Sequence, residues 1–306
     1  MYHHIAELSD LAPLHNAAAL RLIRTISEQL PTSIPLAFFD TSFHSTLPPH
    51  VRTYPISPAR AQKNKLRKYG FHGLSYASIL RHTSASLGKA KERVSIIALH
   101  LGSGASACAI RDGASLDTSM GITPLAGLPG ATRSGSVDPS LVFHYTHNAG
   151  KPSRAASKEL HVTRAEEILN KECGWKALAG TTDFGVVSEG RSEEARLAFD
   201  IFVDRVVGFV GSYFVKLGGR VDALVFAGGI GEKGAKLRRE VVRAVECLGY
   251  GVDEGKNEAV GKGDEEGVVV EIGKEGCRRV LVVKTDEQSE MALGCMEVAG
   301  KIEAAK

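Results

Sequence analysis

The stretch from residue 221 to residue 245, VDALVFAGGIGEKGAKLRREVVRAV, decides the fold class of this chain. It begins with an apolar segment of strand length, turns at a run of glycines, and continues with a pattern typical of a helix. Strands that lead through glycine turns into helices are typical of α/β proteins, whose ligands bind where the strands end. We therefore expect an α/β fold with ligand-binding loops at its strand ends.

The same alternation continues on both sides of this unit. Residues 93–113 (RVSIIALHLGSGASACAIRDG) predict two strands joined by a tight turn, and residues 192–219 predict a long helix that Ser192 caps and Gly218 ends. Nearer the N-terminus, we expect Asn16 to cap a helix that runs to residue 30, and residues 33–39 to form a short buried strand.

Composition narrows the class of protein further. A chain of 306 residues is long enough for one large or two smaller domains. Its 38 Lys and Arg against 35 Asp and Glu leave a formal charge of +3, which favours neither a nucleic-acid partner nor a membrane partner. The five cysteines lack metal-ligand spacing, and the first residues lack the pattern of a signal peptide, so we expect a cytoplasmic protein.

A pliable loop surrounds one arginine at residues 127–139, GLPGATRSGSVDP. Small neighbours would let the backbone close around an anion while the planar guanidinium of Arg133 clamps it. Two glycine turns, HLGSG at 100–104 and GGIGEK at 228–233, follow apolar strands, where backbone N–H groups can approach a phosphate. Each turn alone is weak evidence, but the three loops together indicate a nucleotide site.

Carboxylates and one histidine complete the candidate chemistry. Asp40 follows an apolar segment, and Asp286 and Glu287 follow another. Such residues are often only turn or cap residues, but Glu287 is also suited to a hard cation, and Asp40 to the same cation or to a nucleophile. His72 is either a buried structural histidine or a hydrogen-bond donor to a phosphoryl group.

Seven segments occur together in an order that is specific. They are LAPLHN, FFDTSFHSTLP, YGFHGLSY, HLGSGAS, DTSMGITPLAGLPGATRSGSVDP, DALVFAGGIGE and VVKTDEQ. On these segments, from about Leu11 to about Gly294, the chain resembles the acetokinase family, the acetate, propionate and butyrate kinases of the actin–hexokinase–Hsp70 superfamily. The resemblance implies a duplicated actin/ribonuclease H-like fold and reversible, direct in-line transfer of a phosphoryl group from ATP to acetate, giving acetyl phosphate. It also implies ATP/ADP and Mg²⁺ or Mn²⁺ as cofactors, and a homodimer.

The resemblance also assigns roles to individual residues. Asp40, His72 and Arg133 match the catalytic residues, and Glu287 matches the metal-binding glutamate. Leu14 and Pro124 fall where the family lines its acetate pocket. The nucleotide-binding positions are His100, Leu101, Gly102, Ser103, Gly104, Asp183, Gly229, Ile230, Gly231, Glu232 and Lys233.

Departures from the family pattern keep other functions open. Family members begin with a strand and a further phosphate loop, so we expect an N-terminally truncated chain: residues 1–42 as a remnant of the first lobe, 43–288 as the complete second lobe, and 289–306 as a helix returning to the first. Ser103 stands where the family usually has Asn, and Gly185 where it has Arg. The alternatives are a catalytically impaired nucleotide- or partner-binding relative and a propionate or butyrate kinase.

Overall fold

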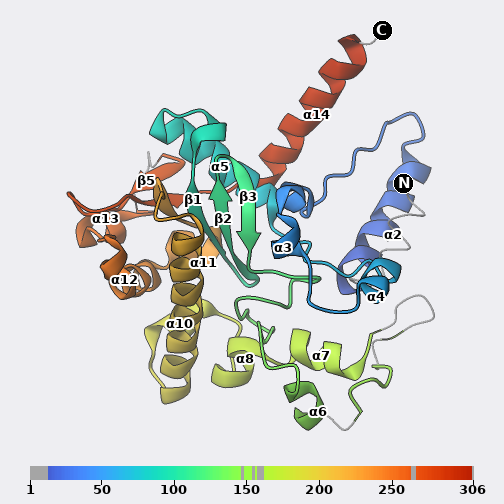
Figure 1. Cartoon of the computed structure of the whole chain (residues 1–306), viewed down its shortest axis with the longest axis horizontal. Helices are drawn as coiled ribbons and strands as arrows, with labels where there is room; N and C mark the ends of the chain where they lie inside the picture. The colour runs from blue at the N-terminus through green and yellow to red at the C-terminus, as the bar shows by residue number, and fades with distance from the viewer. Residues whose placement is uncertain (1–12, 146–147, 154–155, 157–161, 263–266, 305–306) are drawn as a thin grey trace.

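The computed structural model describes residues 13–145, 148–153, 156, 162–262 and 267–304. Its centre is one six-stranded mixed sheet in the order β3-β2-β1-β4-β6-β5 (Figure 1). The strands are β1 (Ile96–Leu101), β2 (Ala105–Arg111), β3 (Ala114–Thr118), β4 (Ala223–Ala227), β5 (Val269–Glu271) and β6 (Val280–Val283). Strands β1, β4 and β6 are parallel, and the hairpin partners β2 and β5 run antiparallel to them. The expected α/β fold is confirmed.

Helices cover both faces of this sheet because the strand residues alternate in direction. Ile97, Leu99 and Leu101 of β1 pack in one apolar cluster with helix α10 (Glu193–Lys216). Ile96 and Ala98 pack in a second cluster with helix α5 (Gly73–Leu87), on the opposite face. The sheet is therefore buried on both sides, as the apolar strand sequences predict.

The long helix α10 begins and ends as the sequence predicts. The Ser192 hydroxyl accepts a hydrogen bond from the backbone N–H of Ala195 at 3.1 Å, which satisfies a free donor of the first turn. The helix ends at Lys216, and Gly218 and Gly219 follow with φ of +65° and +69°. Left-handed glycines allow the chain to leave the helix and enter β4.

The second glycine stretch differs in detail from the expectation. Residues 228–233 form a six-residue helix, α11 (Gly228–Lys233), which is followed by α12 (Ala235–Ala244). Gly228 has a φ of +76°, and a Cβ atom placed on it would lie 2.8 Å from the carbonyl oxygen of Leu101. A glycine is needed here because α11 lies directly against the end of β1.

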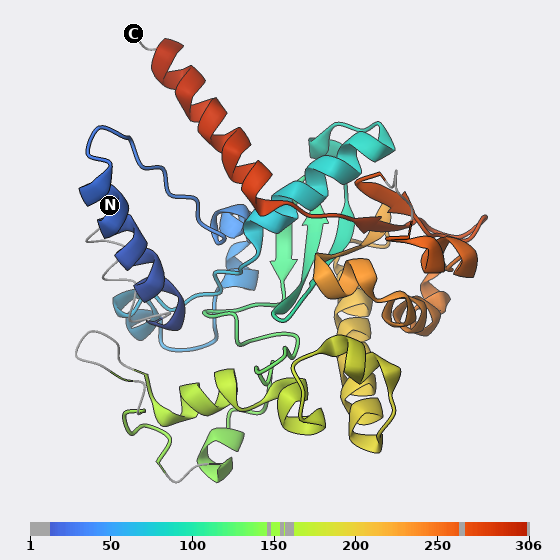
Figure 2. The ribbon, with the colours of Figure 1, turned by 180° about the vertical axis from the view of Figure 1, so that it is seen from behind.

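The remaining α-helices are drawn in Figures 1 and 2. They are α2 (Pro13–Gln29), α3 (Pro49–Arg52), α4 (Pro58–Lys63), α6 (Leu141–Tyr145), α7 (Arg164–Lys171), α8 (Gly174–Ala179), α9 (Phe184–Glu189), α13 (Glu254–Ala259) and α14 (Glu287–Ala304). Both views show α14 leaving the sheet beside α5 and extending away from the body of the molecule. No helix in the described ranges is long and apolar enough to span a membrane.

Two expectations near the N-terminus are wrong. Asn16 lies inside α2, which begins at Pro13, so it is not the N-cap. Residues 33–39 form no strand, and the side chain of Ile34 is 73% exposed. A strand forms only where a neighbour pairs with its backbone, and the segment has no strand partner among the described residues.

Candidate active site

The candidate site lies where β1 and β4 end and where the loop that follows β3 folds back. The backbone N–H of Ala131 donates a 2.9 Å hydrogen bond to the carbonyl oxygen of Ser103, and that of Gly130 donates to the carbonyl of Arg133 at 3.1 Å. These bonds fold the arginine loop onto the HLGSG turn. The structure thus brings two of the three predicted loops into contact, and α11 joins them through Gly228.

Arg133 and His72 converge on Gly104. A Cβ atom placed on Gly104 would lie 3.1 Å from Nη1 of Arg133 and 3.8 Å from Nε2 of His72. Burial lowers the pKa of Arg133, but the group remains a cation at neutral pH. A guanidinium and an imidazole therefore face one point on the backbone, which is free of a side chain, and this arrangement suits a bound anion.

His72 is held in an unusual backbone conformation by buried neighbours. It precedes α5 with a φ of +59°, a left-handed conformation that is uncommon for a residue with a side chain. Its Nδ1 lies 2.8 Å from the hydroxyl of Ser106, which is also hydrogen-bonded to the hydroxyl of Tyr76. Burial, and then the charge of Arg133, lower the pKa of His72 to about 4. The ring is therefore neutral at pH 7.

His100 stacks on His72, with ring centroids 4.1 Å apart. Its Nδ1 lies 2.7 Å from the hydroxyl of Ser75, which contacts the hydroxyl of Thr285 at 2.9 Å. Burial lowers the pKa of His100 to about 3. This chain of contacts joins the end of β1 to α5 and to the end of β6.

Asp40 and Glu287 are neighbouring carboxylates. Oδ1 of Asp40 accepts a hydrogen bond from the backbone N–H of Leu74 at 3.3 Å, which holds it at the first turn of α5. Glu287 is the first residue of α14, and its pKa is raised by burial and then by the charge of Asp40. A divalent cation would relieve this repulsion.

The donor chemistry of this pair fits Mg²⁺ or Mn²⁺. Both side chains offer the hard oxygen ligands that Mg²⁺ prefers, and Mg²⁺ is usually held by one or two carboxylates together with phosphates and water. Across the described segments, no cluster of three or more His, Cys, Asp or Glu side chains could hold a metal ion alone. With one or two carboxylates as protein ligands, the other coordination positions of such an ion are open to phosphate and water.

Two polar side chains, Glu232 and Arg238, hold the GGIGEK segment in place. Oε1 of Glu232 accepts from the backbone N–H groups of Gly228 at 3.1 Å and Thr285 at 3.4 Å, so Glu232 ties α11 to the end of β6. Arg238, only 1% exposed, donates from Nη1 to the carbonyl oxygens of Gly231 and Glu232 at 2.8 and 2.7 Å.

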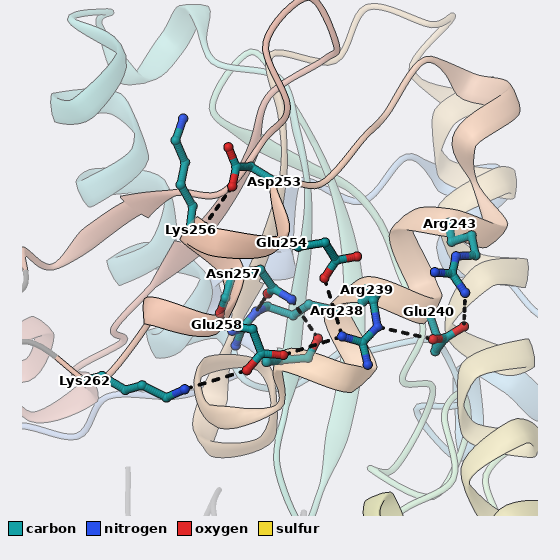
Figure 3. Close-up of polar contacts among 11 residues, drawn as sticks. Arg238, Arg239, Glu240, Arg243, Asp253, Glu254, Lys256, Asn257, Glu258 and Lys262 are labelled. Atoms are coloured by element: carbon teal, nitrogen blue, oxygen red, sulfur yellow. Dashed lines mark hydrogen bonds and ion pairs between the residues drawn. The ribbon is translucent and has the colours of Figure 1, made fainter.

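The same arginine also connects α12 to α13. Its Nε donates to Oδ1 of Asn257 at 2.7 Å, and its Nη2 donates to the backbone carbonyl of Asn257 at 2.8 Å (Figure 3). Asn257 in turn donates to the carbonyl of Ala235 at 2.9 Å. Arg238 therefore holds the carbonyl end of α11 in place through the backbone of Gly231 and Glu232.

The other predicted site residues differ in how exposed they are. Pro124 is buried in the loop that carries Arg133, whereas Lys233 is exposed. Asp183 is exposed and caps α9 by accepting from the N–H of Gly185 at 2.7 Å. Leu14 lies in α2, and its side chain is outside the described part of the structure.

Four polar residues of the site were missed by sequence reasoning: Ser75, Tyr76, Ser106 and Thr285. A signal existed for Ser106, because a β-hairpin turn at 102–104 pairs His100 with Ser106 and turns both toward one face. The residues of α5 carried no such signal, since their partners lie on distant segments.

His44 was missed as well. Its Nε2 donates to the carbonyl of Phe71 at 3.0 Å, and its Nδ1 accepts from the hydroxyl of Ser115 at 2.8 Å. Burial lowers the pKa of His44 to about 4. His44 therefore supports the backbone directly before His72.

Comparison with known proteins agrees with this geometry. The family model described as "Acetokinase family" matches residues 1–293. A probable acetate kinase from Emericella nidulans is 57% identical over 303 residues, covering 98% of this chain and 72% of the relative. An acetate kinase from Streptomyces coelicolor is 41% identical, covering 94% of this chain and 68% of the relative.

Solved structures show the same fold. A propionate kinase from Francisella tularensis superposes with a TM-score of 0.85 at 35% identity, covering 95% of this chain and 71% of that one. An acetate kinase from Porphyromonas gingivalis superposes with a TM-score of 0.84 at 33% identity, covering 97% and 72%. By fold and by sequence, the chain belongs to the acetokinase family.

Proposed function

We propose that this protein is an acetate kinase, which transfers a phosphoryl group reversibly between ATP and acetate to give ADP and acetyl phosphate. The observation that carries the proposal is the convergence of Arg133 Nη1 and His72 Nε2 on the bare backbone of Gly104. Phosphoryl transfer depends mainly on positioning and on stabilising charge on the phosphoryl oxygens. A fixed cation and a neutral N–H donor on one anion site supply both.

In this proposal an acetate oxygen attacks the γ-phosphorus in line with the bond to ADP, which breaks as the new bond forms. Arg133 and His72 bind the phosphoryl oxygens during the transfer, and Asp40 helps to orient the reacting groups. The lowered pKa of His72 keeps its ring neutral near pH 7. A neutral ring donates from Nε2 when Nδ1 accepts from Ser106.

The nucleotide would lie along the two glycine segments. We assign its phosphates to residues 100–104 and 229–233, and its adenosine side to the segment around Asp183. Asp40 and Glu287 would hold Mg²⁺ or Mn²⁺. Bound there, the metal ion would neutralise charge on the phosphate oxygens.

The wider assignments are also proposals. We assign residues 43–288 to a nucleotide-binding lobe, residues 1–42 and 289–306 to the other lobe, and Leu14 and Pro124 to the acetate pocket. The exposed apolar side chains of Leu22 (64%) and Met296 (71%) support the lobe assignment, since they leave α2 and α14 with apolar surface to pack. We further propose a cytoplasmic homodimer, in keeping with the five free cysteines.

Trapping the product with hydroxylamine tests this function. Purified protein with ATP and Mg²⁺ should form acyl hydroxamate from acetate, with a higher kcat/KM than from propionate or butyrate. One methylene in an apolar pocket changes binding by about 1–3 kcal/mol, so the preference should be about 10-fold or more. A preference for propionate would favour the propionate kinase, and nucleotide binding without turnover would favour the non-catalytic relative.

A further inference from the structure

A polar cavity lies at the other end of the parallel strands from the glycine loops. Its volume is about 350 Å³. Ser95 precedes β1, Asp222 precedes β4 and Arg278 precedes β6, and all three line the cavity. Since Gly104 follows the end of β1, the two sites are separated by the length of this six-residue strand, about 20 Å at 3.3 Å per residue.

Four arginines from distant parts of the chain line this cavity, which we call the arginine pocket: Arg93, Arg111, Arg220 and Arg278. They come together because the parallel strands begin at this edge and β2 ends there. Throughout the described ranges, none of the four guanidinium groups forms an ion pair with a carboxylate.

Two carboxylates also line the pocket, but both have other partners. Asp222 forms an ion pair with Lys89 and accepts from the backbone N–H of Ser95 at 2.9 Å. Asp112 accepts from the hydroxyl of Ser95 at 3.4 Å. The lining therefore carries four positive charges against two negative ones, and Lys89 balances one of the latter. The arginine side chains therefore repel one another, and a bound anion would offset this repulsion.

Two of the arginines are held in position by the protein. Nη2 of Arg111 donates to the carbonyl of Lys216, while its Nε is buried and has no hydrogen-bond partner among the described residues. The guanidinium of Arg278 lies 5.0 Å from the ring centroid of Phe214. Arg93 and Arg220 are exposed and can adjust to a ligand. Fixed cations lower the entropy cost of binding, and exposed ones allow entry.

We propose that the arginine pocket is a second anion site, which binds a small compound carrying two phosphate groups. A planar guanidinium group binds two oxygens of one phosphate group at once. Four such groups around one cavity suit a ligand that carries more than one negative charge. The volume lies within the range of pockets for small ligands, about 300–1,000 Å³. The site is distinct from the phosphoryl site at Gly104, because it lies at the other end of the parallel strands.

Calorimetric titration with inorganic pyrophosphate tests the proposal. The catalytic site should also bind this anion, so the titration is done on the Arg133→Ala protein, which lacks the clamp at Gly104. We expect the binding that remains to weaken by about tenfold or more when Arg93→Gln and Arg220→Gln are added, since charge-assisted hydrogen bonds to phosphate are lost. Arg205→Gln, an exposed arginine of α10 outside the pocket, is the matched control and should leave the affinity unchanged.

Two results would overturn the proposal. The Arg133→Ala protein could bind no pyrophosphate, or the protein with Arg93→Gln and Arg220→Gln could bind it as tightly as the control does. A parallel titration with fructose 1,6-bisphosphate distinguishes a free diphosphate from an organic bisphosphate as the preferred form. Circular dichroism of each variant shows whether the protein is still folded, so that a loss of binding is not mistaken for unfolding. The titration tests this proposal whether or not the protein phosphorylates acetate.

Discussion

The imidazole rings of His72 and His100 stack with their centroids 4.1 Å apart and their planes at 28°. Both rings resist protonation, because desolvation lowers the pKa of each and the charge of Arg133 lowers that of His72 further. The stack therefore presents neutral imidazole to the anion site at neutral pH.

The first prediction concerns the loss of folding stability at acid pH that His44, His72 and His100 cause. The folded-state pKa is about 4 for His44 and His72 and about 3 for His100, whereas an unfolded histidine titrates near 6.5. Between these values the unfolded chain binds more protons, so stability falls as the pH drops from about 6.5 toward 4. Each histidine should cost about 2 kcal/mol between pH 7 and pH 5.

Urea unfolding at pH 7, 6 and 5 measures this loss. At pH 5, these three histidines together should take up nearly three protons per molecule on unfolding. A free energy of unfolding that stays constant over the range would show that the histidines are not buried as the structure has them.

The second prediction concerns the positioning of His72 by Ser106. Ser106→Ala removes the hydroxyl that lies 2.8 Å from Nδ1 and frees the ring to rotate or to change tautomer. We expect kcat to fall about 10- to 100-fold with little change in the KM for ATP. Nitrogen NMR of the imidazole should show a smaller share of the Nε2–H form.

Ser115→Ala is the matched control, because Ser115 makes the same 2.8 Å contact with Nδ1 of His44. It should reduce stability by a similar amount while leaving the tautomer of His72 unchanged. If the two variants lose the same activity and show the same NMR spectrum for His72, Ser106 has only a structural role.

The third prediction concerns the bare backbone at Gly104. In Gly104→Ala the new methyl group would lie 3.1 Å from Nη1 of Arg133, so the guanidinium must shift away from the anion site. The guanidinium must move by a few tenths of an ångström. Since a displacement of about 1 Å in such a site lowers kcat about 100-fold, we expect kcat to fall about 3- to 10-fold. Steady-state kinetics with ATP and acetate measure it.

Gly208→Ala provides the comparison, because a Cβ there meets no atom within 4 Å. Gly208 lies inside α10, so alanine should stabilise the protein by up to about 1 kcal/mol and leave kcat unchanged. Equal activity in the two alanine variants would contradict the placement of Arg133.

The fourth prediction concerns the buried guanidinium of Arg238. Arg238→Leu leaves the carbonyls of Gly231 and Glu232 and the amide of Asn257 without their donors. We expect a loss of about 3–5 kcal/mol in the free energy of unfolding and a higher KM for ATP, because α11 is no longer fixed.

Arg239→Ala, one residue along α12, tests whether burial is the cause. Arg239 makes only partly exposed ion pairs with Glu240, Glu254 and Glu258, at 3.4 to 3.5 Å, which lie around the buried pair in Figure 3. Such pairs contribute at most about 1 kcal/mol. Guanidinium chloride unfolding of both variants should therefore separate them clearly, and similar losses would refute the assignment.

Much of this architecture could be predicted from the sequence, because the signals are local. The apolar segments 96–101 and 223–227 are followed by glycine runs, and Ser192 and Gly218 mark the ends of α10. The prediction of a strand at 33–39 was wrong because it depends on a contact that is distant in the sequence. The apolar composition of this segment is typical of a strand, but pairing depends on a distant partner, which the described residues do not provide.

The candidate site, too, could be predicted only in part from the sequence. Arg133 and His72 stand in distinctive segments and could be named from the sequence. Their supporting contacts with Ser106 and Ser75 could not, because those contacts depend on the register of β1 with β2 and on how α5 packs over it. The arginine pocket could not be predicted from the sequence either, because its residues are spread over nearly two hundred positions between Arg93 and Arg278.

The most direct test of the central claim compares acetyl phosphate formation by the unmodified protein, Arg133→Ala and Arg205→Ala. If Arg133 binds the phosphoryl group in flight, its replacement should lower kcat by about 10²- to 10³-fold, the usual cost of losing one such donor. Arg205→Ala, on the exposed face of α10, should keep full activity. An Arg133→Ala protein that is folded and turns over within tenfold of the unmodified protein would contradict the account.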